Sequence, residues 1–298
     1  MRLDSATVVS QGRRNQQEDT IASDFPEGSD VGFVVLGDGM GGHACGEIAS
    51  KLVVAGVFSA IKRQSENPDL LERRMGDILE DAAVEANARI GKYTHTRPET
   101  QGMGTTLLSP VIVRDKLYWI SIGDSPLYIF RRNTLYRLNQ THTLQGQLDY
   151  LVRNNLLDPE EAKNCDPNSL TSAIAGYQIA QIDCCDSPVT LLDRDILIVA
   201  SDGLQFLSDE EISQTVSRVQ NEPASSIGNA LMGQINALDH PDQDNVVCCI
   251  VKVEPNIDMS DLEVPMSVES GVVPTLGPGT GLVCREYAAR QARNTGIA

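Results

Sequence analysis

Aspartates stand beside glycine or asparagine at the edges of apolar stretches in four places along the chain. The four motifs are Gly37-Asp38-Gly39, Gly123-Asp124-Ser125, Ser201-Asp202-Gly203 and Asp244-Asn245. Strand ends present side chains to a shared rim of a sheet, and glycine lets the backbone bend sharply there. Mg²⁺ and Mn²⁺ prefer carboxylate and carbonyl oxygens as ligands. Together the motifs predict a shared metal site, although each alone is also ordinary turn chemistry.

A second group of charged residues, Arg14, Glu18 and Asp19, lies near the N-terminus. A guanidinium beside bound metals can grip a phosphate with two hydrogen bonds. A solvated, charged loop is the alternative interpretation. The glycine-rich stretch 39–42 also suggests a nucleotide-binding loop, but it lacks the Gly-Lys-Ser/Thr ending and the G-x-G-x-x-G spacing of such loops.

Short apolar runs rich in β-branched residues predict the strands that would carry these motifs. The runs occupy residues 31–36, 105–113, 116–122, 126–130, 195–200 and 245–253. Several are joined by only a few residues, which favours antiparallel hairpins over parallel crossovers.

Longer segments carry apolar residues at helical spacing and are rich in good helix formers. These segments are residues 44–64, 69–92, 208–219 and 222–238. Ser208 followed by Glu211 is a capping-box pattern at the start of the third. Hairpins in the middle of the chain, with helix pairs before and after them, predict an α+β layered domain.

Two segments do not fit this pattern of strands and helices. Residues 139–170 form a polar, helical insert that we interpret as a mobile flap. After residue 253 proline, glycine and serine are frequent and periodicity is weak. We therefore expect one domain over residues 1–253 and a linker or C-terminal tail over residues 254–298.

The acidic composition argues against some classes of binding protein. The 298 residues include 41 Asp and Glu against 24 Lys and Arg, for a formal net charge of -17. Such acidity argues against binding to nucleic acid or to an anionic membrane. The chain shows no secretory signal and no membrane-length apolar run. The 7 cysteines include no C-x-x-C pair, so we expect reduced thiols in a cytoplasmic protein. We also expect the protein to be a monomer.

In order and spacing, six motifs resemble those of the bacterial PP2C-type (PPM) protein serine/threonine phosphatases. They are Arg14-x-x-x-Glu18-Asp19, Gly37-Asp38-Gly39-Met40-Gly41-Gly42-His43, Gly102-Met103-Gly104-Thr105-Thr106, Gly123-Asp124-Ser125, Ser201-Asp202-Gly203-Leu204 and Asp244-Asn245. The resemblance covers about residues 5–253. It implies an antiparallel β-sandwich flanked by helix pairs, in α-β-β-α layers, with two Mn²⁺ or Mg²⁺ ions at one end.

The resemblance also implies a set of metal ligands. Asp38 would bridge the two metals, and Asp202 and Asp244 would complete the shell of one of them. The carbonyl of Gly39 would bind the other metal, and Glu18 would reach it through water.

Four further residues take roles by the same resemblance. Asp124, together with the ligand Asp202, matches a third-metal site. Arg14 matches the phosphate-binding arginine, and Asp19 would orient a water held by the metals. His43 would either donate a proton to the leaving oxygen or cap the start of the following helix.

The activity implied is hydrolysis of phosphoserine and phosphothreonine by a metal-activated water. The partners implied are phosphoprotein substrates, including a bacterial Ser/Thr kinase that the enzyme would oppose. The alternative is a catalytically silent module of the same fold that binds phosphoproteins. Two positions depart from the family pattern, since Pro126 and Ser172 stand where relatives usually carry a basic residue and an arginine. These changes bear on packing beside the flap and on substrate preference.

Overall fold

The computed structural model describes residues 1–41, 45–145, 169–185 and 187–255, together with positions 148, 152 and 158. The flap predicted at residues 139–170 lies largely outside the described residues. The predicted tail lies outside them except for its first two positions.

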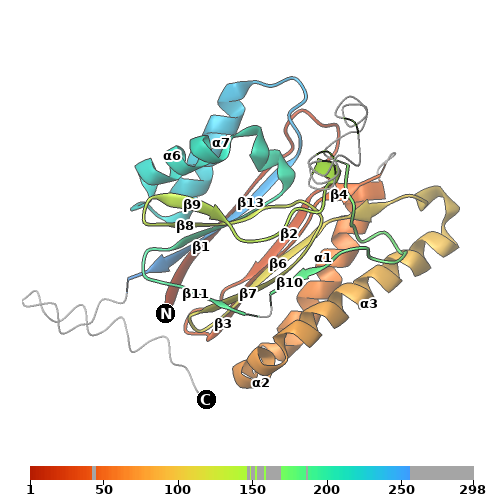
Figure 1. The fold of residues 1–298 in the computed structure, drawn as a ribbon, viewed down its shortest axis with the longest axis horizontal. Helices are drawn as coiled ribbons and strands as arrows, with labels where there is room; N and C mark the ends of the chain where they lie inside the picture. Colours follow the sequence, from red (N-terminus) through yellow and green to blue (C-terminus); the bar gives the residue numbers. More distant parts are fainter. Residues whose placement is uncertain are drawn as a thin grey trace, which may run out of the picture. The chain divides into compact units, whose positions relative to one another are not determined.

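Two antiparallel sheets stand at the centre of the described chain (Figure 1). The first has the order β1 (Arg2–Ser10), β13 (Val246–Glu254), β12 (Ile196–Ala200), β8 (Leu127–Arg131) and β9 (Thr134–Arg137). The second has the order β10 (Asp183–Cys184), β7 (Lys116–Ile122), β6 (Leu107–Val113), β3 (Val31–Gly37) and β2 (Thr20–Asp24), and β11 (Val189–Thr190) also pairs with β7. A small separate ladder joins β4 (Gly39–Met40) to β5 (Gly104–Thr105).

Helices cover the outer face of each sheet. On the second sheet lie α1 (Cys45–Gln64), α2 (Pro68–Arg73) and α3 (Met75–Thr96), and on the first lie α6 (Asp209–Val219) and α7 (Ala224–Leu238). Two short 3₁₀ helices occupy Pro98–Thr100 and Asp202–Phe206. None of the described helices has the length and apolar character needed to span a bilayer.

Three apolar cores separate these four layers. Strand β3 contributes to two of these cores, because its successive side chains point to opposite faces of the sheet. Phe33 and Val35 pack toward α1 and α3, whereas Val34 and Leu36 pack between the two sheets. A third core fills the space between the first sheet and α6 and α7. The predicted α-β-β-α sandwich is therefore confirmed.

The predicted elements match the observed ones closely, with two kinds of difference. The helix predicted over residues 69–92 is two helices, because Arg74 leaves the helical region with φ -118° and ψ 22°. Strands β1, β2 and β9 were not predicted. The side chains of β1 and β9 alternate between exposed and half-buried positions for much of their length, and β2 is half-buried at every position but one. None of these strands forms a continuous apolar run.

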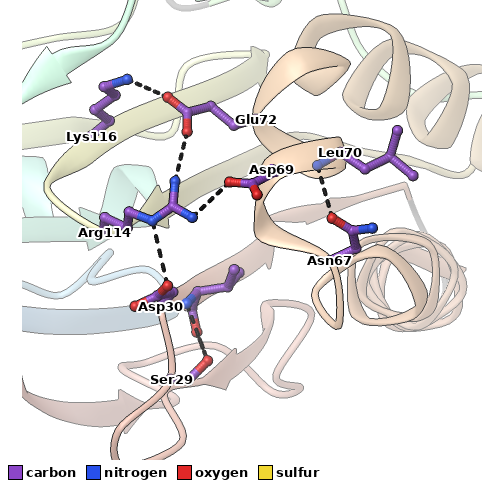
Figure 2. A network of polar contacts seen from close by, with 9 residues as sticks. Ser29, Asp30, Asn67, Asp69, Leu70, Glu72, Arg114 and Lys116 are labelled. Carbon is purple, nitrogen blue, oxygen red and sulfur yellow. Dashed lines mark hydrogen bonds and ion pairs between the residues drawn. The ribbon is translucent and has the colours of Figure 1, made fainter.

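A network of charged side chains ties the β6–β7 turn to the neighbouring layers (Figure 2). Arg114 occupies this turn with a left-handed φ of 58°. Its guanidinium lies 2.7 Å from Asp69, 3.3 Å from Glu72 and 3.4 Å from Asp30. Lys116 also pairs with Glu72. The turn, α2 and the loop between β2 and β3 are thereby joined at one end of the second sheet.

Candidate metal centre

Most of the predicted site residues line one pocket of about 650 Å³. They come from segments far apart in the sequence: Arg14, Glu18, Asp38, Gly39, Asp124, Asp202 and Asp244. Each lies near an end of a strand, since Asp38 follows β3 directly and Asp244 precedes β13. The fold therefore brings the separate acidic turns to one rim, as the sequence predicted.

The backbone of Asp38 is held by two threonines. Its N–H donates to Oγ1 of Thr106 at 2.9 Å, and its carbonyl accepts from Oγ1 of Thr105 at 2.9 Å. The Thr106 hydroxyl also shares a hydrogen bond of 2.8 Å with Ser125, the residue after Asp124. Two acidic turns are thus fixed relative to each other through one buried hydroxyl.

Gly39 allows a close approach that no other residue would permit. A Cβ atom there would lie 2.4 Å from the Gly46 carbonyl oxygen and 2.5 Å from the Glu18 carbonyl oxygen. The Glu18 side chain packs against Gly46 in turn, where a Cβ atom would lie 2.8 Å from Oε1. These two glycines set Glu18, the Asp38 turn and the start of α1 against one another.

Asn245 connects the segment that carries Arg14 and Glu18 to the start of β13. Its Nδ2 donates to the carbonyls of Gln11 and Gln16, both at 2.9 Å, and its Oδ1 accepts from the Glu18 N–H at 2.8 Å. All three bonds go to backbone groups. The side chain therefore fixes the path of residues 11–18 along the pocket.

The Arg14 guanidinium lies at the pocket wall and meets a predicted metal ligand. Its Nη2 atom donates to Oδ2 of Asp244 at 2.6 Å, and the Arg14 side chain is 56% exposed. This is the one hydrogen bond of the guanidinium to a described residue. The remaining N–H groups are available to an anion in the pocket.

Asp19 is 7% exposed and is not among the residues that line the pocket. Burial, opposed in part by hydrogen bonds from Ser201 and Asp38, raises the pKa of Asp19 to about 7. Among the described residues its Oδ2 atom is buried and has no hydrogen-bond partner. An unpaired, buried carboxylate oxygen is costly, and a cation or a bound water would relieve it.

The pKa values of the other carboxyl groups of the site are also raised, mainly by burial. Burial, and then the negative charge of Asp202, raises the pKa of Asp124 to about 6. Burial and the neighbouring carboxylates raise the pKa of Asp38 well above its ordinary value. Burial is also the first cause of the raised pKa values of Asp202 and Glu18. Arg14 partly offsets this effect at both Asp202 and Glu18.

These donors fit hard divalent cations. Among the described residues no three His, Cys, Asp or Glu side chains stand in the arrangement of a metal site. The Asp38 carboxyl instead shares hydrogen bonds with Asp19 and Asp202, and Asp244 pairs with Arg14. The donor set is nevertheless oxygen-only, and Arg14 offsets its negative charge only in part, which is the chemistry that Mg²⁺ and Mn²⁺ match.

Some lining residues were given no site role from the sequence, namely Asn15, Gln16, Met40, Gly41, Thr106, Leu170 and Asn245. All except Leu170 lie in or beside the motifs, so proximity in sequence could have suggested them. Leu170 is the last residue of the predicted insert, and no role was predicted for it. The predicted residue His43 lies outside the described residues.

Pro126 and Ser172, which depart from the family pattern, both lie among described residues. Pro126 follows the turn of Asp124 and is buried. Beside that turn, Nη2 of Arg137 donates to the Asp124 carbonyl at 2.6 Å, so an arginine from β9 supports it. Ser172 bonds the backbone of Gln181 twice, donating to its carbonyl at 2.6 Å and accepting from its N–H at 3.0 Å.

The chain is similar in sequence to known proteins. The sequence matches the family described as protein phosphatase 2C over residues 9–236. The serine/threonine protein phosphatase PstP of Mycobacterium tuberculosis is 32% identical over 190 residues, which cover 62% of this chain and 34% of PstP. This chain therefore matches only about a third of the length of that relative.

Solved structures show the same fold. The serine/threonine phosphatase of S. agalactiae is 27% identical, with a TM-score of 0.69 over 85% of this chain and 100% of that one. The catalytic domain of PstP in complex with 2 manganese ions is 25% identical, with a TM-score of 0.63 over 85% of this chain and 99% of that one.

Proposed function

The chain belongs to the protein phosphatase 2C family, and on this basis we propose that it is a metal-dependent protein serine/threonine phosphatase. One observation carries the proposal. Acidic residues from widely separated turns line a single pocket together with Arg14. Such a pocket joins a site for cations to a group that binds phosphate.

We assign the metal-binding roles to the oxygen donors of the pocket. Asp38 would bridge two ions, with Asp202 and Asp244 on one ion and the Gly39 carbonyl and Glu18 on the other. Asp124 would join Asp202 at a third ion. Manganese is supported by the relative that contains it, and magnesium shares the same ligand chemistry. When bound, such ions lower the pKa of water and offset the charge of a phosphate group.

The remaining residues position the substrate and water. The N–H groups of Arg14 that are not bonded to Asp244 would hold two phosphate oxygens, which aligns the phosphorus for in-line attack. Oδ2 of Asp19 would accept a hydrogen bond from the attacking water and so fix its orientation. No covalent nucleophile is required by this arrangement.

We propose phosphoserine and phosphothreonine proteins as substrates, including a Ser/Thr kinase and its targets. The named relatives support this class, since they are serine/threonine phosphatases of bacteria. We place this activity in the cytoplasm and expect the chain to act as a monomer. The thiols of Cys248 and Cys249, which are buried and form no disulfide, are compatible with a reducing compartment.

The test is release of phosphate from a phosphothreonine peptide by the purified chain. Turnover is expected with Mn²⁺ or Mg²⁺ and should be lost after chelation and restored by either ion. Absence of metal-dependent turnover would overturn the proposal. Calorimetry in the same samples distinguishes the alternative, because a catalytically silent module would bind the phosphopeptide tightly and leave it intact.

A further inference from the structure

A second pocket of about 620 Å³ lies at the other end of the first sheet from the acidic turns. Its lining comes from the β8–β9 turn, the turn before β12 and the end of α6, and it contains three arginines against two aspartates: Arg131, Arg132, Arg194, Asp193 and Asp195. Strands β8 and β12 each span five residues between the two ends. At the usual rise of a strand this is about 16 Å, so the two pockets are separate.

The pairing of β8 with β12 brings two of these arginines onto neighbouring turns. Phe130 pairs with Ile196, and one step further Arg131 donates to both carboxylate oxygens of Asp195, at 2.8 and 2.5 Å. Arg132 follows Arg131 in the chain and Arg194 precedes Asp195, so these two arginines occupy the turns next to this ion pair. Asp195, the buried carboxylate of this pocket, is therefore already paired with Arg131.

Arg132 and Arg194 have no such partner. Neither side chain makes a hydrogen bond or ion pair with any residue in the described ranges. Like charges on neighbouring strands repel one another. In a chain with 41 acidic residues and a net charge of -17, two adjacent arginines without a carboxylate partner are unexpected.

The backbone conformation at positions 132 and 194 also disfavours arginine. Arg132 and Arg194 have left-handed φ values of 53° and 70°. Glycine, asparagine and aspartate tolerate this conformation best, and other residues adopt it at a cost. Arg114 shares the conformation but is held by three carboxylates (Figure 2), so its guanidinium serves the fold. No such structural use accounts for Arg132 and Arg194.

Apolar side chains line the same pocket. Phe130 and Leu191 are buried, whereas Leu192 is 42% exposed. A ligand held here would therefore meet the two guanidiniums, the exposed Leu192 and the exposed carboxylate of Asp193. The volume lies within the usual range for small-molecule sites.

We propose that this pocket binds a small phosphate-bearing ligand with an apolar body, of the phosphomonoester class. Arg132 and Arg194 hold the phosphate group, whose double negative charge matches two guanidiniums better than a single carboxylate does. Leu192 and its neighbours contact the apolar part. This site is independent of the catalytic pocket and of the proposed phosphatase activity.

The test is calorimetric titration of the full chain with phenylphosphonate, which the enzyme cannot hydrolyse, in the presence of a chelator. The variant carries both Arg132→Asn and Arg194→Asn. Asparagine favours the left-handed conformation, so it removes the guanidiniums while keeping the turns folded. Loss of two charge-assisted hydrogen bonds should weaken binding roughly ten-fold or more. Equal melting temperatures and unchanged turnover of p-nitrophenyl phosphate show that the variant is intact.

The matched control is Arg14→Asn in the catalytic pocket, which should leave this binding unchanged. Three results would overturn the proposal. The first is no binding of phenylphosphonate to the wild-type chain at millimolar concentration. The second is binding that Arg14→Asn abolishes and the double variant retains. The third is equally tight binding of benzoate, which would show that a phosphate group is not what the pocket recognises.

Discussion

At the scale of single residues, Asn245 has a positioning role that its chemistry makes easy to test. Its amide group bonds three backbone groups of residues 11–18, which carry Arg14 and Glu18. Asn245→Ala would leave these groups unpaired, at a cost of about 1–3 kcal/mol each where they stay buried. We expect a lower melting temperature and a raised KM for a phosphopeptide, because Arg14 loses its fixed position.

The control for this prediction is Asn229→Ala on the exposed face of α7, which should change neither quantity. An Asn245→Ala enzyme with the melting temperature and KM of the wild type would contradict the role assigned to this side chain.

The sequence identified the residues of the pocket better than it identified their supports. Asp38, Asp202 and Asp244 could be predicted because each occupies a short motif at a strand edge. The partnership of Arg14 with Asp244 could not, since 230 positions separate them in sequence. Arg137 was also missed, because its contact with the Asp124 carbonyl depends on the pairing of β8 with β9.

At the scale of elements, the buried strand β13 predicts a loss of stability in alkaline solution. Burial raises the pKa of the Cys249 thiol to about 11, and it raises the pKa of Cys248 further. On β8, burial and a hydrogen bond to Asp209 raise the pKa of Tyr128 to about 12. The native protein therefore keeps protons that the unfolded chain releases near pH 9 to 10.

The sign follows from linkage. Where the native state binds more protons than the unfolded state, the free energy of unfolding falls as pH rises. The contribution of these groups is complete below about pH 8.5, the ordinary thiol pKa, and is lost above it. Urea unfolding at pH 8 and pH 10.5 should show this fall, and Cys249→Ala should make it shallower. The same slope in both proteins would exclude the thiol as a cause.

The strands that could be predicted from the sequence are those that are buried on both faces. Strands such as β3 and β13 form continuous apolar runs because helices and a second sheet cover both faces. Strand β1 could not be recognised by that criterion, because it pairs on one side only and alternates in exposure. From Asp4 to Ser10 its exposure alternates, which is a period-2 pattern and not an apolar run.

At the scale of the whole molecule, the net charge of -17 and the cluster of buried carboxyl groups predict a specific response to divalent cations. Any salt screens general repulsion, whereas a ligand that binds only the native state stabilises it in proportion to its occupancy. We expect about 0.1 mM Mn²⁺ to raise the melting temperature more than NaCl at the same ionic strength; a ligand at roughly 100 times its Kd adds about 2.7 kcal/mol. Equal effects of the two salts would argue for screening alone.

The central claim is that the acidic turns form a metal-dependent catalytic centre, and turnover by Asp38→Asn tests it most directly. The substitution keeps the size of the side chain and the backbone hydrogen bonds to Thr105 and Thr106, but it removes the charge from the proposed bridging ligand. With saturating Mn²⁺ and a phosphothreonine peptide, we expect kcat to fall by at least about 100-fold, equivalent to about 2.7 kcal/mol of transition-state stabilisation. A folded Asp38→Asn enzyme with wild-type turnover would contradict it.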